Sequence, residues 1–364
     1  MRLIIDSHLD IAWNALSFNR DQTMSVAQIR EAERSLKDDR SRGHGMVSLP
    51  DMRRGGVMLC MATLLARVKP SVWPERGFMR TDLDYAHPSI AYATAQGQLA
   101  YYRQLEVMEE ISLIASRSEL DAHWARCQEA TDLTDVPVGV ILAMEGTDPI
   151  VSPSQSDQWW DNGLRVASLV HFGEGPYAFG TGSDGPVSES GFQLLAEFER
   201  LGMILDTTHL CDTSWYQATD AFSGTIIASH NNCRSVTPGG RQFSDDQLSR
   251  IIQRNGIIGI AFHTAMLSKR WIRDSRSDIV GVTIADAVDH IDHICQLAGN
   301  AEHVSFGTDL DGGFGTQESP CDMDTIADLQ KFDALLTNRG YADDDIELIF
   351  NGNWLRLLRT CLPS

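Results

Sequence analysis

The chain has 364 residues, of which 43% are hydrophobic, and its formal net charge is −20 at pH 7. So acidic a protein is repelled by a nucleic-acid duplex and by an anionic membrane surface, which argues against either partner. It has no apolar run of about 18 residues, the length that predicts a membrane-spanning helix. The apolar run near the first residue is too short for a signal peptide, so we expect a cytoplasmic protein.

The chain contains seven cysteines, an odd number, and no two of them form a CxxC pair. This pattern is typical of reduced thiols in a cytosolic protein rather than of a disulfide framework or a zinc–thiolate site. We therefore expect most of the cysteines to be small buried side chains.

Short apolar runs rich in β-branched residues recur along the chain. They predict fully buried parallel strands, because they are continuously apolar rather than alternating. In chain order the expected strands are Leu3–His8, Gly56–Leu64, Val136–Met144, Val166–His171, Met203–Thr208, Thr225–Ser229, Ile257–Phe262 and His303–Thr308.

Segments with helical periodicity separate these strands. The expected helices are Ala91–Ile111, Ser116–Cys127, Phe192–Leu201, Asp245–Arg254 and Ile284–Leu297. Ser244 is expected to cap the fourth of these helices. His290 and His293 lie three residues apart on the fifth, and we interpret them as part of a solvated face rather than as a second metal site.

Alternating strands and helices predict parallel pairing through right-handed crossovers. Eight repeats favour an α/β fold of the closed (β/α)8 type, a TIM barrel, formed by a single domain over residues 1–364. The alternative is a doubly wound open sheet, but no glycine-rich phosphate loop follows the first strand. Two long connections, 67–87 and 172–191, follow strand C-terminal ends and are expected to overhang the active-site face.

Several expected strands end in a side chain that can bind a metal or carry a proton. His8 ends the first strand and Asp10 lies two residues further on, and residues two apart point to the same side of an extended chain. Glu145 ends the third strand, and its two oxygens can hold two cations at once. No lysine ends a strand, so a carbamylated lysine cannot supply that bridge. Alone, Glu145 is explained more simply as a salt-bridged group at the barrel rim.

His209 and His230 end the fifth and sixth strands, and neutral imidazole is a good ligand for zinc and similar divalent metals. Either histidine alone is explained more simply as a hydrogen-bonded core residue. Together with His8, Asp10 and Glu145 they supply five ligands from four strand ends. That set matches a two-metal site with one shared carboxylate.

Asp309 ends the eighth strand, which adjoins the first strand in a closed barrel. It should therefore lie beside His8 and Asp10, where it could ligate a metal or accept a proton from metal-bound water. We favour the catalytic role for Asp309 and interpret Asp311 as a residue of the rim or turn.

His171 ends the fourth strand, where it could polarise a substrate carbonyl or stabilise an oxyanion. A structural histidine is the alternative interpretation. Arg241 lies in the loop after the sixth strand, and its planar guanidinium can bind a carboxylate at two points. By itself, an arginine there is explained more simply as a solvated surface residue. His263 ends the seventh strand and is assigned no role.

Six segments resemble motifs of the membrane (renal) dipeptidase family, peptidase family M19, among the amidohydrolase-type metal barrels. They are residues 6–10 (DSHLD), 144–146 (MEG), 205–209 (LDTTH), 229–236 (SHNNCRSV), 307–312 (GTDLDG) and 351–356 (NGNWLR). The order along the chain is that of the family. Residues 170–175 (VHFGEG) depart from it, since the family has T-H and an Asn-containing stretch there.

The resemblance implies a barrel with two zinc ions, or other divalent metals in their place. It assigns five residues to the metals: His8 and Asp10 to one ion, His209 and His230 to the other, and Glu145 to both as a bridge. It makes Asp309 the proton shuttle, His171 the histidine on the carbonyl side and Arg241 the anchor for the substrate carboxylate.

We therefore expect a zinc-dependent dipeptidase in which a metal-bridging hydroxide attacks the peptide bond of a dipeptide, including dipeptides with a D-residue at the C-terminal position. One alternative is a metal-dependent deacylase or amidohydrolase that acts on a non-peptide amide or ester. Another is an inactive, metal-bound binding protein. The expected partner is the small dipeptide, without nucleic acid or membrane, and the sequence leaves a homodimer open.

Overall fold

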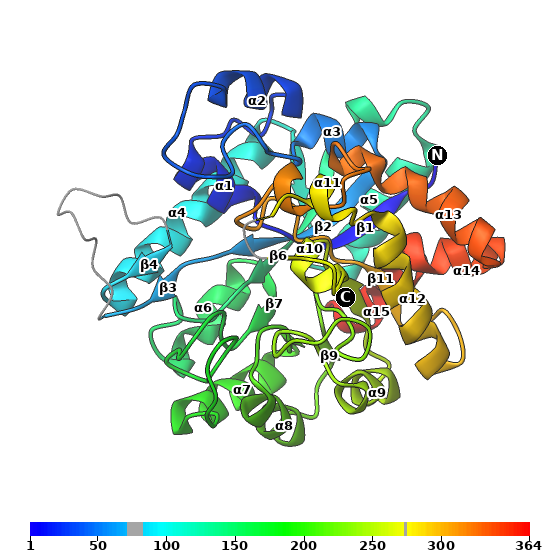
Figure 1. Ribbon diagram of the computed structural model, residues 1–364. Coiled ribbons are helices and arrows are strands. Elements are labelled where there is room, and N and C mark those ends of the chain that lie inside the picture. Colours follow the sequence, from blue (N-terminus) through cyan, green and yellow to red (C-terminus); the bar gives the residue numbers. More distant parts are fainter. Residues whose placement is uncertain (71–82, 273–274) are drawn as a thin grey trace.

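The computed structural model describes residues 1–70, 83–272 and 275–364. Within that part of the chain, eight parallel strands form a nearly closed barrel, in the order β10-β11-β1-β2-β6-β7-β8-β9, with helices around it (Figure 1). Their bounds are β1 (Ile4–Leu9), β2 (Val57–Leu64), β6 (Val138–Met144), β7 (Leu164–Ser168), β8 (Ile204–Asp206), β9 (Ile226–Ile227), β10 (Ile258–Ile260) and β11 (Val304–Phe306). The predicted parallel α/β barrel is confirmed.

The barrel closes between β9 and β10 through one isolated bridge rather than a ladder. Ala228 pairs with Ile258 in parallel, and the Gly259 N–H donates to the Ala228 carbonyl at 2.8 Å. The two backbones come very close here: a Cβ built on Gly259 of β10 would lie only 2.0 Å from the carbonyl oxygen of Ser229, which follows β9. Glycine at 259 therefore lets β10 meet the end of β9.

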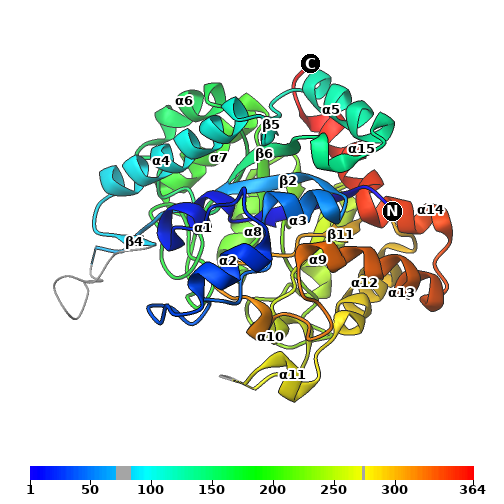
Figure 2. The same ribbon diagram turned by 90° about the horizontal axis from the view of Figure 1, so that it is seen from above.

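The helices surround the barrel, as the two views in Figures 1 and 2 show. Their bounds are α1 (Ile11–Phe18), α2 (Val26–Glu33), α3 (Leu49–Arg54), α4 (Pro88–Val107), α5 (Arg117–Glu129), α6 (Ser156–Asp161), α7 (Glu189–Leu201), α8 (Asp212–Ala221), α9 (Asp245–Gln253), α10 (Thr264–Leu267), α11 (Ser277–Val280), α12 (Ile284–Ala298), α13 (Lys331–Arg339), α14 (Asp343–Glu347) and α15 (Asn353–Cys361). Figure 2 shows the C-terminus beside α5, where the Arg117 N–H donates to the Pro363 carbonyl at 2.7 Å. Among the helices described, none combines the length and the apolar character needed to cross a membrane.

Two local features differ from the predicted elements. The expected helix Ala91–Ile111 ends at Val107, and a short strand, β5 (Ile111–Leu113), follows it. Glu109, with φ 60°, turns the chain out of the helix. β5 pairs with residues 138–140 of β6, whereas β7 pairs with residues 142–144. One edge of β6 is therefore shared by two strands.

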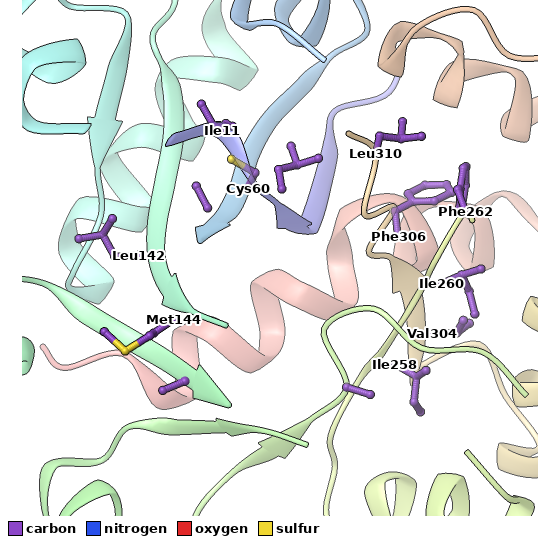
Figure 3. Packing of buried hydrophobic residues seen from close by; sticks show 14 of the residues in the cluster. Ile11, Cys60, Leu142, Met144, Ile258, Ile260, Phe262, Val304, Phe306 and Leu310 are labelled. Carbon is purple, nitrogen blue, oxygen red and sulfur yellow. The ribbon is translucent and has the colours of Figure 1, made fainter. Parts of the chain in front are cut away.

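Figure 3 shows how the last strands of the barrel pack. Ile260 on β10 and Phe306 on β11 are fully buried. The Phe306 ring lies 5.1 Å from that of Phe332 on α13 and 5.3 Å from that of Phe350. This aromatic packing fixes the end of β11, and the loop that carries Asp309 begins directly after it.

The seven cysteines are all unpaired in the structure. Cys60, Cys127, Cys211 and Cys233 are buried, and Cys321 alone is exposed. The expectation that most of the cysteines are buried is confirmed by these four.

Candidate metal centre and substrate cleft

The predicted site residues meet at the carboxyl ends of the barrel strands. His8 lies in β1, Asp10 follows β1, and Glu145 directly follows β6. The others come from the loops after four more strands: His171 after β7, His209 after β8, His230 after β9 and Asp309 after β11. Residues up to 301 positions apart in the chain, from His8 to Asp309, thus share one end of the barrel.

Four histidines converge on one oxygen of Glu145. The Nε2 atoms of His209, His230, His8 and His171 lie 3.2, 3.3, 3.5 and 3.6 Å from Glu145 Oε1. Burial alone would raise the pKa of this carboxyl, but the surrounding imidazoles lower it well below its ordinary value. Glu145 is therefore ionised at neutral pH, as a carboxylate that bridges cations must be.

A second group of ligand atoms lies beside the first. His8 Nε2 is 4.0 Å from Asp10 Oδ1 and 3.9 Å from Asp309 Oδ1, and the Thr63 hydroxyl donates to Asp10. Burial and the nearby Glu145 raise the pKa of Asp10 to about 7. Burial also raises the pKa of Asp309 well above its ordinary value. These carboxylates repel one another, and a cation between them would relieve that repulsion.

Hydrogen bonds behind the cluster decide which nitrogen of His230 faces it. The Ser229 hydroxyl donates to Asp206 Oδ2 at 2.5 Å, so its oxygen accepts from His230 Nδ1, which lies 2.9 Å away. The proton of His230 is then on Nδ1, and the Nε2 lone pair points toward Glu145. The same hydroxyl lies 3.3 Å from His8 Nδ1 and can orient that ring in the same way.

Sequence reasoning missed the two buried aspartates that hold these loops. Asp6 Oδ1 accepts from the N–H groups of His8 (3.1 Å) and Thr308 (3.0 Å), and so ties β1 to the end of β11. Asp206 Oδ1 accepts from the Thr208 N–H at 3.1 Å. Both lie in fully buried strands, IIDSHL and ILD, and a carboxylate next to a pair of apolar residues in such a strand is the signal that could have found them.

The residues present fit a divalent metal site. The Nε2 atoms of His209 and His230 lie 3.1 Å apart. Arg241 Nη2 lies 3.3 Å from His209 Nε2, and a guanidinium only donates, so this nitrogen also presents a lone pair. His8 Nε2 is buried without a hydrogen-bond partner. Lone pairs that face one another around Glu145 call for a cation between them.

Three groups of side chains bring potential ligand atoms within 4.8 Å of one another. They are Glu145, His209 and His230; His8, Asp10 and Asp309; and His8, Asp206 and His230. The first two contain all five predicted ligands. The third is the weaker candidate, because hydrogen bonds to Ser229 and Thr208 already occupy both oxygens of Asp206.

Two cluster residues adopt a backbone conformation that side chains disfavour. His209 has φ 69° and Asp309 has φ 57°, both in the left-handed region. Such conformations cost roughly 1–3 kcal/mol each and occur most often at functional sites. The Asp309 N–H donates to the His8 carbonyl at 3.3 Å, which holds this turn against β1.

Arg241 is a partly buried residue of the cluster rather than a solvated surface arginine. Nη2 donates to the His230 carbonyl at 2.9 Å, and Nη1 donates to Asn231 Oδ1 at 3.3 Å. No carboxylate in the described part of the chain lies within ion-pair distance of it. Burial lowers the pKa of Arg241 to about 10, so it remains charged at neutral pH. Arg241 is therefore a charged side chain with no anionic partner among the described residues.

His171 has a different partner from the other histidines. Its Nδ1 atom lies 3.3 Å from Nη1 of Arg67. Asp84 holds Arg67 through two bonds, of 2.7 Å to Nε and 2.9 Å to Nη2. Burial lowers the pKa of His171 to about 4, so the imidazole is neutral at pH 7. Arg67 has no motif around it, and only the fold reveals its position.

The cluster opens into a cleft of about 440 Å³. Its lining joins Asp10, Glu145, His171, Arg241 and Asp309 to apolar side chains that include Trp13, Leu65, Phe172 and Phe314. Both long connections reach it, the first through Arg67 and Leu83 and the second through Phe172 and Thr181. The two connections were predicted to overhang the active-site face, and these four residues confirm it. Residues 71–82 of the first connection lie outside the described part of the chain.

The structure adds to what the sequence indicated for two further residues. Asp311 lies in a turn, with φ 65°, but not at an exposed rim: it is buried, and its carboxylate accepts from the N–H groups of Met46 (2.8 Å) and Val47 (3.0 Å). It anchors that segment below the site. His263, which had no assigned role, lines the cleft, and its Nδ1 accepts from the Ala265 N–H at 3.1 Å, so that it caps α10.

Imidazole and carboxylate ligands gathered at the mouth of a parallel barrel define a metal-binding α/β-barrel protein. A family model described as membrane dipeptidase (peptidase family M19) matches residues 2–362. The chain therefore belongs to the membrane dipeptidase family, a family of metallopeptidases.

Curated relatives match over part of their length. An uncharacterized dipeptidase of Schizosaccharomyces pombe is 27% identical over 228 residues, which cover 61% of this chain and 53% of that protein. Dipeptidase tcpJ of Claviceps purpurea is 28% identical over 204 residues, covering 54% and 44% of the two chains. The chain thus spans about half the length of these relatives.

Solved structures match over nearly the whole chain. The dipeptidase AC, a metallopeptidase of family M19, has a TM-score of 0.78 at 20% identity and covers 100% of this chain and 99% of its own. A metallopeptidase from Rhodobacter sphaeroides, liganded with a phosphinate mimic of the dipeptide L-Ala-D-Ala, has a TM-score of 0.76 at 20% identity, with 99% of each chain covered. An amidohydrolase from Pseudomonas aeruginosa has a TM-score of 0.69 at 14% identity, with 99% of this chain and 97% of that one covered. At these identities the likeness shows the fold.

Proposed function

We propose that this chain is a zinc-dependent dipeptidase that hydrolyses the peptide bond of dipeptides, including those with a D-residue at the C-terminal position. The proposal rests on Arg241, a charged guanidinium that, among the residues the structure describes, has no carboxylate partner in a cleft that also holds the ligand cluster. A dipeptide has a scissile carbonyl and a free carboxylate close together, so it can meet both. Family membership supports the dipeptide, and the ligand of the Rhodobacter sphaeroides relative supports the D-residue.

The metals would be held by His8, Asp10, Glu145, His209 and His230. Divalent ions bound there would polarise the scissile carbonyl and make water nucleophilic at neutral pH. The protein's own groups do the rest. Arg241 binds the C-terminal carboxylate with its planar fork of donors and so fixes the position of the peptide bond.

Proton transfer falls to Asp309. One of its carboxylate oxygens takes the proton of the attacking water and delivers it to the leaving amine nitrogen, which departs as the free amino group. The raised pKa of the buried carboxyl suits it to hold that proton between the two steps. His171, neutral at pH 7, donates a hydrogen bond to the carbonyl oxygen while negative charge develops there.

The test compares Arg241→Met with the unchanged chain on two substrates, L-Ala-D-Ala and its C-terminal amide. For the free dipeptide, KM should rise at least tenfold in the variant, because about 2 kcal/mol of charge-assisted bonding is lost. For the amide, which has no carboxylate to lose, the two proteins should differ little. Equal effects on both substrates would contradict the role of Arg241. Faster cleavage of N-acyl amino acids or esters than of any dipeptide would favour the deacylase alternative.

A further inference from the structure

Arg67 contacts the ring nitrogen of His171 that points away from the ligand cluster. We propose that Arg67, held by Asp84, is a positioning residue that fixes the tautomer of His171, so that His171 presents an Nε2–H donor to the substrate. This inference rests on the proposed function only for the identity of the substrate. The hydrogen-bond geometry behind it belongs to the protein without any ligand.

The tautomer follows from the donor inventory of the two side chains. A guanidinium has five N–H donors and no acceptor, so in its 3.3 Å contact with Arg67 Nη1 the Nδ1 atom of His171 must accept. A neutral imidazole carries one proton, and that proton is therefore on Nε2. Nε2 lies 3.6 Å from Glu145 Oε1, on the side of the ring that faces the centre of the site.

The guanidinium is held firmly enough to impose this choice. Asp84 takes Nε and Nη2 of Arg67 at 2.7 and 2.9 Å, which leaves Nη1 directed at His171. Backbone pairing supports the arrangement: β3 (Arg67–Val68) and β4 (Asp84–Tyr85) form a small parallel sheet, and the Arg67 N–H donates to the Leu83 carbonyl at 2.9 Å. Because Asp84 neutralises Arg67, Arg67 does not compete with Arg241 for a substrate carboxylate.

Hydrogen bonds outside the cluster thus sort its histidines into two kinds. The Ser229 hydroxyl, which donates to Asp206, places the proton of His230 on Nδ1 and leaves Nε2 free to ligate. Arg67 has the opposite effect on His171, and a nitrogen that carries a proton cannot bind a metal. The second partner of each ring therefore decides whether a histidine is a ligand or a hydrogen-bond donor.

The kinetic test uses Arg67→Met, Arg67→Lys and Asp84→Asn on L-Ala-D-Ala. Removal of an outer-shell partner typically costs about 10–100-fold, so kcat should fall by that factor in Arg67→Met with KM nearly unchanged. Arg67→Lys should recover part of the loss, because an ammonium also only donates. Asp84→Asn, which loosens Arg67 without removing it, should lie between. Arg103→Met, at an exposed arginine bonded to Asn162, is the control and should match the unchanged chain.

A double substitution separates positioning from general damage. In a His171→Asn background, Arg67→Met should lower kcat by less than about twofold, since there is no tautomer left to fix. A full additional loss would overturn the proposal, as would a rise in KM at constant kcat, which would make Arg67 a direct substrate ligand.

A spectroscopic test needs no substrate. In long-range ¹H–¹⁵N spectra of the zinc-loaded, ¹⁵N-histidine-labelled protein, the His171 signals are those missing from His171→Asn. They should show an unprotonated Nδ1 and a protonated Nε2, and should shift toward a mixture of tautomers in Arg67→Met. A protonated Nδ1 in the unchanged chain would overturn the inference. If the spectra are as expected but no dipeptide is cleaved, the proposed function fails and the tautomer assignment stands.

Discussion

Asp309 is the most accessible carboxylate of the cluster: its side chain is 16% exposed, against 4% for Glu145 and 3% for Asp10. It comes from a strained turn at the end of β11 and lines the cleft. A carboxyl with a raised pKa that still reaches the substrate is suited to carry protons rather than to hold a metal permanently.

Replacing Asp309 by Asn should therefore lower kcat at least about 100-fold, the lower range for loss of a general acid–base group. The amide keeps the shape of the side chain but cannot take up a proton. Steady-state kinetics and metal analysis of the same preparation check this, and the metal content should stay the same. Unchanged turnover would contradict the shuttle, and loss of metal would make Asp309 a ligand instead.

The sequence reveals the residues of the ligand cluster more readily than those that orient them. His8, Glu145 and His230 could be predicted because each ends an apolar run. Ser229 and Arg67 could not, because their roles depend on partners that only the fold supplies. Arg67 meets His171, 104 residues further along the chain.

Helix α12 contains a buried histidine that the helical periodicity did not identify. His290 is fully buried and neutral, and its Nδ1 accepts from the Cys233 N–H at 3.1 Å while Nε2 lies 3.2 Å from the Leu267 carbonyl. The solvated face predicted for this helix is wrong at His290. His293 is half-buried and pairs with Asp245 at 2.8 Å.

Burial lowers the pKa of His290 from 6.5 to about 4. In the unfolded chain this histidine binds a proton as the pH falls below 6.5, whereas in the folded chain it does so only near pH 4. The stability it contributes is therefore present above pH 6.5 and is lost as the pH falls toward 4. Between pH 7 and pH 5 the loss should be about 2 kcal/mol. Urea unfolding at both pH values measures this loss. In His290→Gln the free energy of unfolding should fall by about 2 kcal/mol less between pH 7 and pH 5 than in the unchanged chain. An equal fall in both proteins would contradict the lowered pKa of His290.

Ser244 caps the N-terminus of α9, as expected from the sequence, and the structure shows that it does so in a capping box with Gln247. The Ser244 hydroxyl accepts from the Gln247 N–H at 3.3 Å, and Gln247 Oε1 accepts from the Ser244 N–H at 2.9 Å. Ser244→Ala should lower the free energy of unfolding by about 1 kcal/mol, and Ser244→Gly by only a few tenths. Chemical denaturation of the two variants measures the difference. Equal losses would show that the hydroxyl does not cap the helix.

Strand positions were predictable because buried parallel strands are continuously apolar, but strand ends were not. The expected strand Thr225–Ser229 is reduced to β9 (Ile226–Ile227), because the residues beyond it leave the ladder to carry His230 into the site. β5 was missed for another reason. It follows α4 so closely that its first residue, Ile111, continues the helical periodicity in the sequence. Only the turn at Glu109 separates the strand from the helix.

We expect metal bound at the ligand cluster to stabilise the whole barrel. One isolated bridge joins β9 to β10, and the candidate ligands come from β1 and from the loops after β1, β6, β8 and β9. Without a cation, Asp10 and Glu145 place like charge in a buried site, within a chain of net charge −20. The eight-strand plan could be predicted from the sequence, whereas this weak closure could not, since it depends on backbone contacts of Ala228 and Gly259.

Removing metal with EDTA should therefore lower Tm by about 5 °C or more. The reason is that a ligand that binds the folded chain but not the unfolded chain stabilises the folded chain by mass action. Scanning calorimetry with and without added zinc measures the shift. Glu145→Gln is the control: its Tm should respond much less, because the bridging charge is gone. An equal response in both proteins would place the metal elsewhere.

Metal-dependent dipeptide hydrolysis is tested most directly with L-Ala-D-Ala and one protein preparation that is stripped of metal and then titrated with zinc. We expect the rate to fall at least about 100-fold on stripping and to return as close to two zinc ions bind per chain. Full activity of the metal-free protein, or zinc binding without any restored hydrolysis, would contradict it.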